Sequence, residues 1–231
     1  MNTKRPAAET LPDFQKITLK EKIHEYDDVY TFVFTPSKKA IYQPGDAIHL
    51  RVDTMKEGPG RRAKKMSFAS SPNNTDIIFS MRIREASAYK KALGLLKVGE
   101  ETSVFKSNGS FHLPTDEKHV VMLAAGVGIT PFVSILSSLE DVQQDIKLIY
   151  VSGKDFLFQD ILTNPAFNQL KVSRDEFRES LLETTKDADN SFYMISGGEG
   201  FIKDSLAILL DEGIDESRIL LDQFTGYENW S

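Results

Sequence analysis

The sequence of 231 residues contains no cysteine. A disulfide framework, a thiolate-bound iron–sulfur cluster, a cysteine zinc site and a catalytic thiol are therefore excluded. The four histidines (His24, His49, His112 and His119) show neither the i, i+4 spacing nor the carboxylate partners of a ligand set. We therefore predict no metal site.

The sequence also lacks a long apolar run. The most hydrophobic stretch, Val120 to Leu139, is interrupted by two glycines and a proline, and no stretch approaches the roughly 18 residues of a membrane helix. Residues 1–12 lack the central apolar segment of a signal peptide. We expect these residues to form a disordered tail, and we expect a soluble, cytoplasmic protein without a membrane span.

Positive charge is not in surplus. The formal net charge of −6 argues against a nucleic-acid binder, which needs a basic face. The one dense basic run comprises Arg61, Arg62, Lys64 and Lys65, and it is either a solvated loop or a docking surface. With 40% hydrophobic and 27% charged residues, the composition is that of a globular protein with a core.

The first half of the chain has the pattern of an antiparallel sheet. Apolar and polar residues alternate over residues 30–35, 48–53 and 77–84, and turn-forming segments separate these runs. This period of two predicts an antiparallel β-barrel. One helix is expected within it, from about Ser87, its N-cap, to Leu96.

The second half has the pattern of an α/β domain. Val120 to Ala124 predicts a buried strand, and a helix with Thr130 as N-cap and Pro131 at the first helical position follows a glycine-rich turn. Further strands are expected at residues 147–151 and 191–195, and another helix ends at Gly213. Alternating strands and helices predict a doubly wound parallel sheet. We place the barrel at residues 13–114 and a nucleotide-binding α/β domain at residues 115–231.

Three segments have the chemistry of a nucleotide site. Gly126 and Gly128 follow a strand and precede a helix, where backbone N–H groups can bind a phosphate. This is not the G-x-G-x-x-G pattern, so a tight strand–helix turn is the alternative. The second segment places Arg82, Arg84, Lys90 and Lys91 around the expected helix start at Ser87. Cations there oppose the helix dipole, which favours a bound pyrophosphate over a basic surface patch.

The third segment, Lys64 to Ser71, alternates small hydroxyl and apolar residues before a turn. Such a strand end suits hydrogen bonding to a polar heteroaromatic ring, although by itself it is more typical of an edge strand.

In this order and at these distances, the three segments resemble the ferredoxin–NADP reductase superfamily. The resemblance extends from about Phe14 to Tyr227. Four further segments support it: Tyr42–Asp46, Ser107–Phe111, Tyr193–Gly198 and Asp222–Tyr227. It implies that a flavin-binding barrel precedes a nicotinamide-binding domain and that FAD and NAD(P)H meet between them.

The resemblance also implies roles for individual residues. On the flavin side these are Lys64, Met66, Ser67, Ala69, Ser70, Arg82, Ile83, Arg84, Ser87, Ala88 and Tyr89. On the nicotinamide side they are Gly126, Gly128, Thr130, Pro131, Ser196, Gly197 and Gly198. Phe224 or Tyr227 would shield the flavin until nicotinamide displaces it. Ser67, at the reactive edge of the flavin, is a candidate catalytic residue together with Thr130 and Ser196.

Three positions depart from the family pattern. Lys64 stands where arginine is usual, Met66 replaces a tyrosine, and Ser196 stands where many members have a cysteine. Lysine cannot bind a phosphate in the bidentate manner of arginine. We expect these changes to affect flavin affinity and the rate of hydride transfer more than the fold.

The predicted function is transfer of hydride from NAD(P)H to FAD and of electrons to an external acceptor, such as an acidic ferredoxin or flavodoxin docked on residues 61–65. The alternatives are a reductase of free flavin, ferric complexes or small quinones, and a flavin- or nucleotide-binding module without turnover. Ser152 and Lys154 could bind the 2′-phosphate of NADP, which the sequence slightly favours. Asp155, in contrast, would favour NAD.

Overall fold

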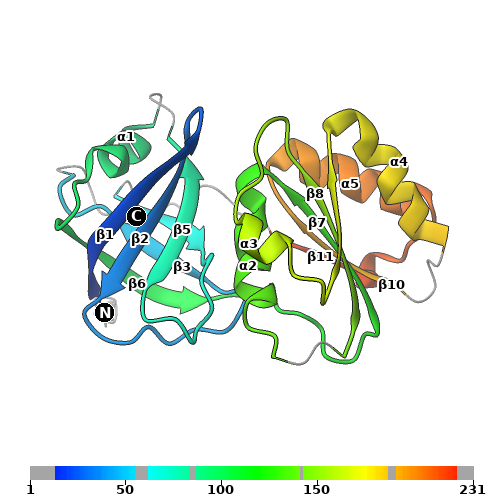
Figure 1. The fold of residues 1–231 in the computed structure, drawn as a ribbon, viewed down its shortest axis with the longest axis horizontal. Helices are drawn as coiled ribbons and strands as arrows, with labels where there is room; N and C mark the ends of the chain where they lie inside the picture. Colours follow the sequence, from blue (N-terminus) through cyan, green and yellow to red (C-terminus); the bar gives the residue numbers. More distant parts are fainter. Residues whose placement is uncertain (1–13, 56–61, 84–86, 141–142, 187–190, 223–231) are drawn as a thin grey trace, which may run out of the picture.

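The computed structural model describes residues 14–55, 62–83, 87–140, 143–186 and 191–222. They form an antiparallel sheet and a parallel sheet with helices, one after the other along the chain (Figure 1). This confirms the predicted fold class. The predicted boundary at residue 114 falls within the segment that joins the two sheets, and it stays a prediction.

The barrel is one antiparallel sheet in the order β4-β3-β6-β1-β2-β5. Alternating residues of its strands point inward, so that Phe32, Phe34 and Phe79 are fully buried in one core. The strands are β1 (Gln15–Tyr26), β2 (Val29–Pro36), β3 (Ala47–Arg51), β4 (Ala63–Ser67), β5 (Ile77–Arg82) and β6 (Glu101–Asn108). Helix α1 (Ala88–Leu95) begins as predicted at Ser87, whose side chain accepts a hydrogen bond from the Lys90 N–H.

The second domain is a parallel sheet in the order β11-β10-β7-β8-β9. Its strands are β7 (His119–Ala125), β8 (Asp145–Val151), β9 (Asn168–Val172), β10 (Ser191–Ser196) and β11 (Ile219–Leu221). Its helices are η2 (Gly126–Ile129), α2 (Thr130–Leu136), α3 (Gln159–Leu162), α4 (Arg174–Thr184), α5 (Glu199–Asp211) and η4 (Glu216–Arg218).

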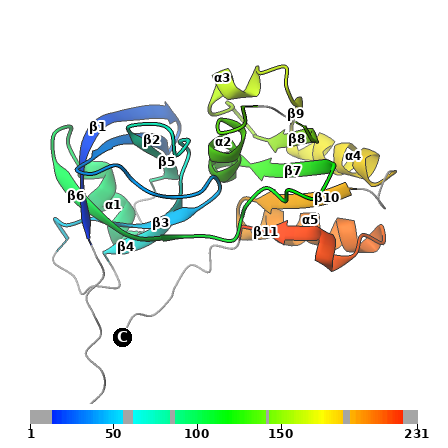
Figure 2. The ribbon, with the colours of Figure 1, turned by 90° about the horizontal axis from the view of Figure 1, so that it is seen from below.

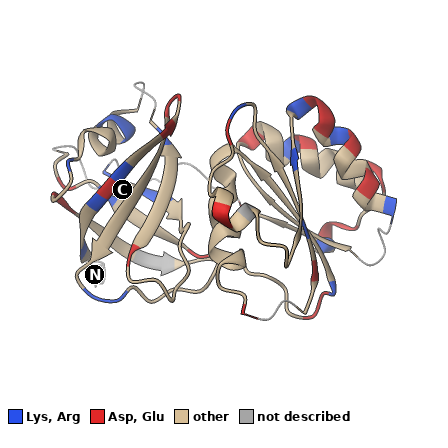
Figure 3. Cartoon of the chain, viewed as in Figure 1, with Lys and Arg blue, Asp and Glu red and all other residues tan. Residues whose placement is uncertain are grey.

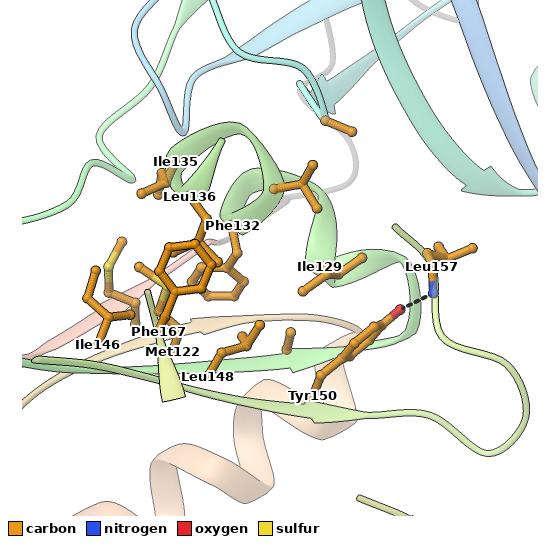
Figure 4. Packing of buried hydrophobic residues seen from close by; sticks show 14 of the residues in the cluster. Met122, Ile129, Phe132, Ile135, Leu136, Ile146, Leu148, Tyr150, Leu157 and Phe167 are labelled. Carbon is orange, nitrogen blue, oxygen red and sulfur yellow. Dashed lines mark hydrogen bonds between the residues drawn. The ribbon is translucent and has the colours of Figure 1, made fainter. Parts of the chain in front are cut away.

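Both faces of this parallel sheet are covered. Met122 of β7 and Leu148 of β8 pack under α2 on the face toward the barrel (Figure 4). Their neighbours Leu123 and Ile149 pack against α4 and α5 on the other face (Figure 2). Burial on both faces explains why these strands are continuous apolar runs.

Helix α2 also joins the two domains. Its Phe132 ring meets Phe111, which follows the barrel strand β6, edge to face at 5.4 Å. Its Ser134 hydroxyl donates to the carbonyl of Ser70, 2.8 Å away at the end of the barrel. Because both faces of α2 are covered, all seven of its residues are buried.

The predicted start of this helix was wrong: α2 begins at Thr130, one residue earlier than expected, and helical backbone precedes it. A 3-10 turn, η2, runs directly into α2, and the residue that precedes α2 is already helical. Thr130 is therefore not an N-cap: its hydroxyl donates to the carbonyl of Val127 at 3.1 Å. Pro131 is the second residue of α2, one position later in the helix than predicted.

Within the described part of the chain, no helix is both long and apolar enough to cross a membrane.

Candidate functional site between the two domains

Two predicted site residues from different domains meet at one carboxyl group. Ser67 ends β4 of the barrel, and Ser196 ends β10 of the parallel sheet. The Ser67 hydroxyl donates to Asp222 Oδ2 at 3.2 Å, and the Ser196 hydroxyl donates to the same oxygen at 3.1 Å. All three side chains are buried. The end of a barrel strand and the carboxyl end of a parallel strand therefore share one polar centre.

The position of Asp222 follows from the strand that precedes it. β11 pairs in parallel with β10, and the Asp222 N–H continues this pairing by donating to the Ile195 carbonyl at 2.9 Å. The carboxyl group is thereby held beside Ser196. Asp222 was not among the predicted site residues. The available signal in the sequence was a short apolar run, Ile219–Leu221, followed directly by an acidic residue.

Burial governs the protonation of this carboxyl group. It raises the pKa of Asp222 from 3.8 to about 6, because a carboxylate loses hydration energy inside the protein. The hydrogen bonds from Ser196 and Ser67 and the charge of Lys65 act in the opposite direction. Asp222 can therefore take up or release a proton near neutral pH, within reach of both hydroxyls.

A cavity of about 340 Å³ opens beside this centre. Asp222 and Lys65 bring charge to its wall, and both domains contribute to it. Its lining residues are Gly45, Ala47, Lys65, Gly109, Ser110, Phe111, Ile219, Leu221 and Asp222. The contact between the two domains therefore contains a cavity next to the shared carboxyl group.

The predicted glycines play different roles. Gly126 has φ of +54°, and an added Cβ would find open space. Gly128 is packed instead: an added Cβ would lie 2.4 Å from the carbonyl oxygen of Ser196. Gly197 likewise packs against Phe201, whereas Gly198 is open. Gly126 and Gly198 thus leave room for a nucleotide, while Gly128 and Gly197 hold the ends of β7 and β10 together.

The ends of these strands fit an anionic ligand. Neither η2, which starts at Gly126, nor α5, which starts after Gly198, has a side chain that caps its first N–H groups. Helix starts without a capping side chain beside open glycines suit the phosphates of a dinucleotide, and Glu199 in the first turn of α5 acts against an anion there. Thr130 and Pro131 are buried behind this edge, so direct contact between these two residues and a nucleotide stays a prediction.

Several predicted flavin residues have structural roles. The Ser70 hydroxyl is hydrogen-bonded to Tyr42 and to the Ile78 N–H, and Tyr89 is buried with its hydroxyl on the Leu50 carbonyl at 2.9 Å. Met66 packs in the barrel core, and Ala69 packs in the core shared with α2. Flavin contact by these four residues stays a prediction.

The predicted pyrophosphate site has the expected chemistry in part. The first turn of α1 contains no acidic residue, and Ser87 and Ala88 lie at its start. Arg82, however, is paired with Asp28 of the β1–β2 turn at 2.5 Å. Ile83 lies close to Gly94 of α1, where an added Cβ would be 3.0 Å from Ile83 Cγ2. Pyrophosphate binding at the start of α1 stays a prediction, and Arg82 would have to exchange partners to take part in it.

The predicted residues still to be placed are Lys64, Arg84, Ser152, Lys154, Phe224 and Tyr227. The Ser152 hydroxyl donates to the carbonyl of Asp155 at 2.7 Å, and Lys154 pairs with Asp27 at 2.8 Å, so contact between these two residues and a 2′-phosphate stays a prediction. Lys64 is half-buried on β4, one residue away from Lys65, whose side chain points to the opposite face of the strand. Arg84, Phe224 and Tyr227 lie outside the described residues. Among the described residues, no group of three histidine, aspartate or glutamate side chains could hold a metal ion.

Comparison with known proteins places this geometry in context. No protein-family model matches the chain. A ferredoxin NADP+ reductase from Neisseria gonorrhoeae, solved with bound FAD and NADP, superposes with a TM-score of 0.76 at 20% identity, covering 90% of this chain and 98% of that structure. The chain therefore has the two-domain fold of that reductase. The FAD/NAD-binding domain of a Vibrio cholerae nitric oxide dioxygenase gives a TM-score of 0.73 at 22% identity, over 90% and 97% of the two chains.

Curated relatives have similar sequences but longer chains. A flavohemoprotein of Vibrio cholerae is 25% identical over an alignment of 236 positions. The alignment covers 92% of this chain and 59% of that protein. The ferredoxin reductase component of a Mycobacterium tuberculosis 3-ketosteroid-9-alpha-monooxygenase is 29% identical over 61% of this chain and 42% of its own length. The chain thus spans about half the length of the curated relatives that it matches.

Proposed function

We propose that this chain is a flavin-dependent oxidoreductase that takes hydride from NAD(P)H and passes electrons to a separate acceptor. The observation that carries the proposal is the shared carboxyl group: Ser67 on the predicted flavin side and Ser196 on the predicted nicotinamide side both donate to Asp222 Oδ2. Two rings that react by hydride transfer must lie face to face, and Ser67 and Ser196 bring together two strand ends from different domains beside a cavity that both domains line.

When bound, FAD supplies the hydride and single-electron chemistry. The residues of the chain align the two cofactors and control protons. Ser67 can hydrogen-bond to the flavin edge, and Asp222, with a pKa of about 6, can hold a proton one hydrogen bond behind Ser67 Oγ. The open glycines Gly126 and Gly198 would admit the nicotinamide nucleotide at the strand ends.

A visible spectrum tests this proposal directly. The purified chain with added FAD should show bound flavin, and NADH or NADPH should bleach it under anaerobic conditions. A colourless protein that does not retain FAD would contradict the proposal. Tight flavin binding without reduction by either coenzyme would favour a binding module instead.

We further propose that the acceptor is an acidic carrier protein such as a ferredoxin or flavodoxin. The names of two relatives support an external acceptor: the ferredoxin reductase component mentioned above and the electron transfer component of a Burkholderia cepacia 2-halobenzoate 1,2-dioxygenase. Basic residues 61–65 would form the docking surface, although Arg61 lies outside the described residues.

A cytoplasmic location stays a prediction from the sequence.

Charge reversal distinguishes the carrier from a small acceptor. Arg61→Glu with Arg62→Glu should lower the association rate with an acidic carrier and its dependence on salt, because positive charge near a docking surface steers the encounter with an acidic partner. Turnover with ferricyanide should not change. The matched control is Lys38→Glu with Lys39→Glu, on another barrel loop. Equal rates for wild type and the Arg61/Arg62 variant with every carrier, together with saturable turnover of free flavin or quinones, would favour a small acceptor.

A further inference from the structure

The barrel segment that begins at Ser67, the proposed flavin edge, is held from both domains. From the barrel, the ring of Tyr42 stacks on that of Phe68, with ring centres 3.7 Å apart. From the second domain, the Ser134 hydroxyl of α2 donates to the Ser70 carbonyl at 2.8 Å. Ser67, Phe68 and Ser70 are all buried. The segment therefore cannot shift relative to either domain without the loss of one of these contacts.

The hydroxyl of Tyr42 cannot satisfy the carbonyls of this segment by itself. It lies within hydrogen-bond distance of two of them, that of Ser71 at 2.9 Å and that of Ser70 at 3.1 Å. A tyrosine hydroxyl has one proton and can donate fully to only one acceptor. Ser134 supplies the second donor, so that both carbonyls are satisfied. Without Ser134 the two carbonyls would compete for one proton, and the segment would have a less defined position.

Helix α2 connects this hydrogen bond to the nicotinamide side of the proposed site. The helix continues directly from η2, which begins at the open Gly126. Its Phe132 is fully buried in the same core as Met122 of the parallel sheet (Figure 4). Because a core packed in this way resists deformation, the helix and the sheet keep a fixed relative position. Ser134 therefore relates the position of the second domain to the barrel segment that begins at Ser67.

This contact between the domains involves no charged side chain. Neither residues 66–75 of the barrel nor residues 120–139, which include α2, contain a lysine, arginine, aspartate or glutamate. Figure 3 shows charged residues on α4 and α5 instead, which cover the other face of the sheet. Salt screens interactions between charges and has little effect on a buried hydrogen bond between neutral groups. An effect that depends on Ser134 should therefore be the same at low and high salt.

We propose that Ser134 is a positioning residue for hydride transfer: through the Ser70 carbonyl it holds Ser67 in register with the coenzyme side of the second domain. This inference rests on the proposed function, in which the hydride leaves the reduced nicotinamide with both electrons and joins the flavin, so that the coenzyme is oxidised and the flavin reduced. Such a transfer requires close alignment, and a misplacement of about 1 Å by a distant substitution can cost about 100-fold in rate. Ser134 is fully buried, so its removal should change the alignment of the two rings and not the affinity for either cofactor.

The limiting rate of flavin reduction tests this role in the full chain with bound FAD, by rapid mixing with NADH or NADPH under anaerobic conditions. Ser134→Ala should lower this rate about tenfold, at low and at high salt, while the Kd values of the coenzyme and of FAD stay within about twofold of the wild type. Ser134→Cys keeps a weaker donor in nearly the same space and should recover part of the rate. Should Ser134→Ala fail to fold, Ser134→Cys carries the test, with a smaller loss expected.

Hydrogen exchange checks the position of the segment without catalysis. The amides of residues 67–71 should exchange faster in Ser134→Ala, with and without FAD, because the bond that holds the segment to α2 is gone. Ser205→Ala is the matched control. Ser205 is also fully buried in a helix of the second domain, but its hydroxyl donates to the Phe201 carbonyl within α5 at 2.7 Å. This variant should change neither the exchange of residues 67–71 nor the rate of reduction.

The adverse outcomes have separate meanings. If Ser134→Ala retains FAD and is reduced as fast as Ser205→Ala, if only its coenzyme affinity falls, or if the exchange of residues 67–71 is unchanged, the positioning role is overturned while the proposed function stands. If the wild type does not retain FAD, or if neither coenzyme reduces the bound FAD, the proposed function fails, and the inference fails with it.

Discussion

Ser67 and Ser196 lie 129 positions apart and on different domains, yet their hydroxyl groups donate to the same oxygen, Asp222 Oδ2, at 3.2 and 3.1 Å. The barrel and the parallel sheet are therefore joined at their strand ends by a buried polar centre as well as by the apolar packing of α2. Burying a carboxyl group is costly unless hydrogen bonds replace those it made with water. Here two hydroxyl groups donate to Asp222 Oδ2. The arrangement makes Asp222 the residue on which stability and the proposed chemistry both depend.

The stability of the protein should fall as the pH rises through the titration of Asp222. Its pKa is raised from 3.8 to about 6, so the folded state binds more protons than the unfolded state between these values. Relative to Asp222→Asn, the wild type should lose up to about 3 kcal/mol of unfolding free energy between pH 4 and pH 7. Urea denaturation of both proteins at several pH values measures this difference, and parallel curves would contradict it.

A control with the opposite sign is available. Hydrogen bonds from Ser217 lower the pKa of the exposed Asp215. Its contribution to stability is therefore present above its unfolded pKa and is lost as the pH falls. The difference between wild type and Asp215→Asn should change in the other direction with pH.

Ser67→Ala should reduce turnover of NAD(P)H with ferricyanide by about tenfold or more, because it removes the hydroxyl between Asp222 and the proposed flavin edge. Ser67→Thr, which keeps a hydroxyl, should recover part of the rate. Ser80→Ala is the control: Ser80 is also buried in the barrel but bonds to Thr31 at 2.8 Å. An equal loss in both alanine variants, measured by steady-state kinetics, would point to a general structural effect.

Gly128→Ala should destabilise the protein by about 2 to 4 kcal/mol, in the range of overpacked or strained cores. The new Cβ would lie 2.4 Å from the Ser196 carbonyl oxygen and 2.6 Å from the Gly197 Cα, both backbone atoms that cannot rotate away. In Gly200→Ala, by contrast, the Cβ meets open space within α5, so stability should rise by up to about 1 kcal/mol. Thermal and urea unfolding of the two variants compare these effects, and similar stabilities would show that the β7 and β10 ends are not tightly packed.

Gly126→Ala separates backbone strain from ligand binding. Gly126 and Gly213 have φ of +54° and +82°, and an added Cβ at either position meets open space. Alanine at each should cost about 1 kcal/mol of stability through the left-handed backbone. Only at Gly126 should nucleotide affinity also fall, which calorimetry with adenosine 5′-monophosphate can measure. Equal affinities in the two variants would remove Gly126 from the nucleotide site.

The sequence by itself was sufficient for the fold class, because periodicity reports burial directly. The two-residue alternation of the barrel and the continuous apolar strands of the second domain each follow from which faces are covered. The cap at Ser87 was also predictable, since it is a local contact with the Lys90 N–H. Less regular elements were not predicted. These include β9, β11 and α4, although Ser173 and Glu176 form the capping box with which α4 begins.

Tertiary structure alone decided which candidate residues meet. Ser67 and Ser196 were candidates from the sequence, but their common partner Asp222 is placed by the parallel pairing of β11 with β10. The pairing of Lys154 with Asp27 depends on a hairpin held against the other domain by Tyr26 and Val29. Likewise, Ser70 and Tyr89 have hydroxyls suited to a ligand, yet both are bonded within the protein. A sequence displays the chemistry of each side chain, whereas contacts between distant segments depend on the packing of whole domains.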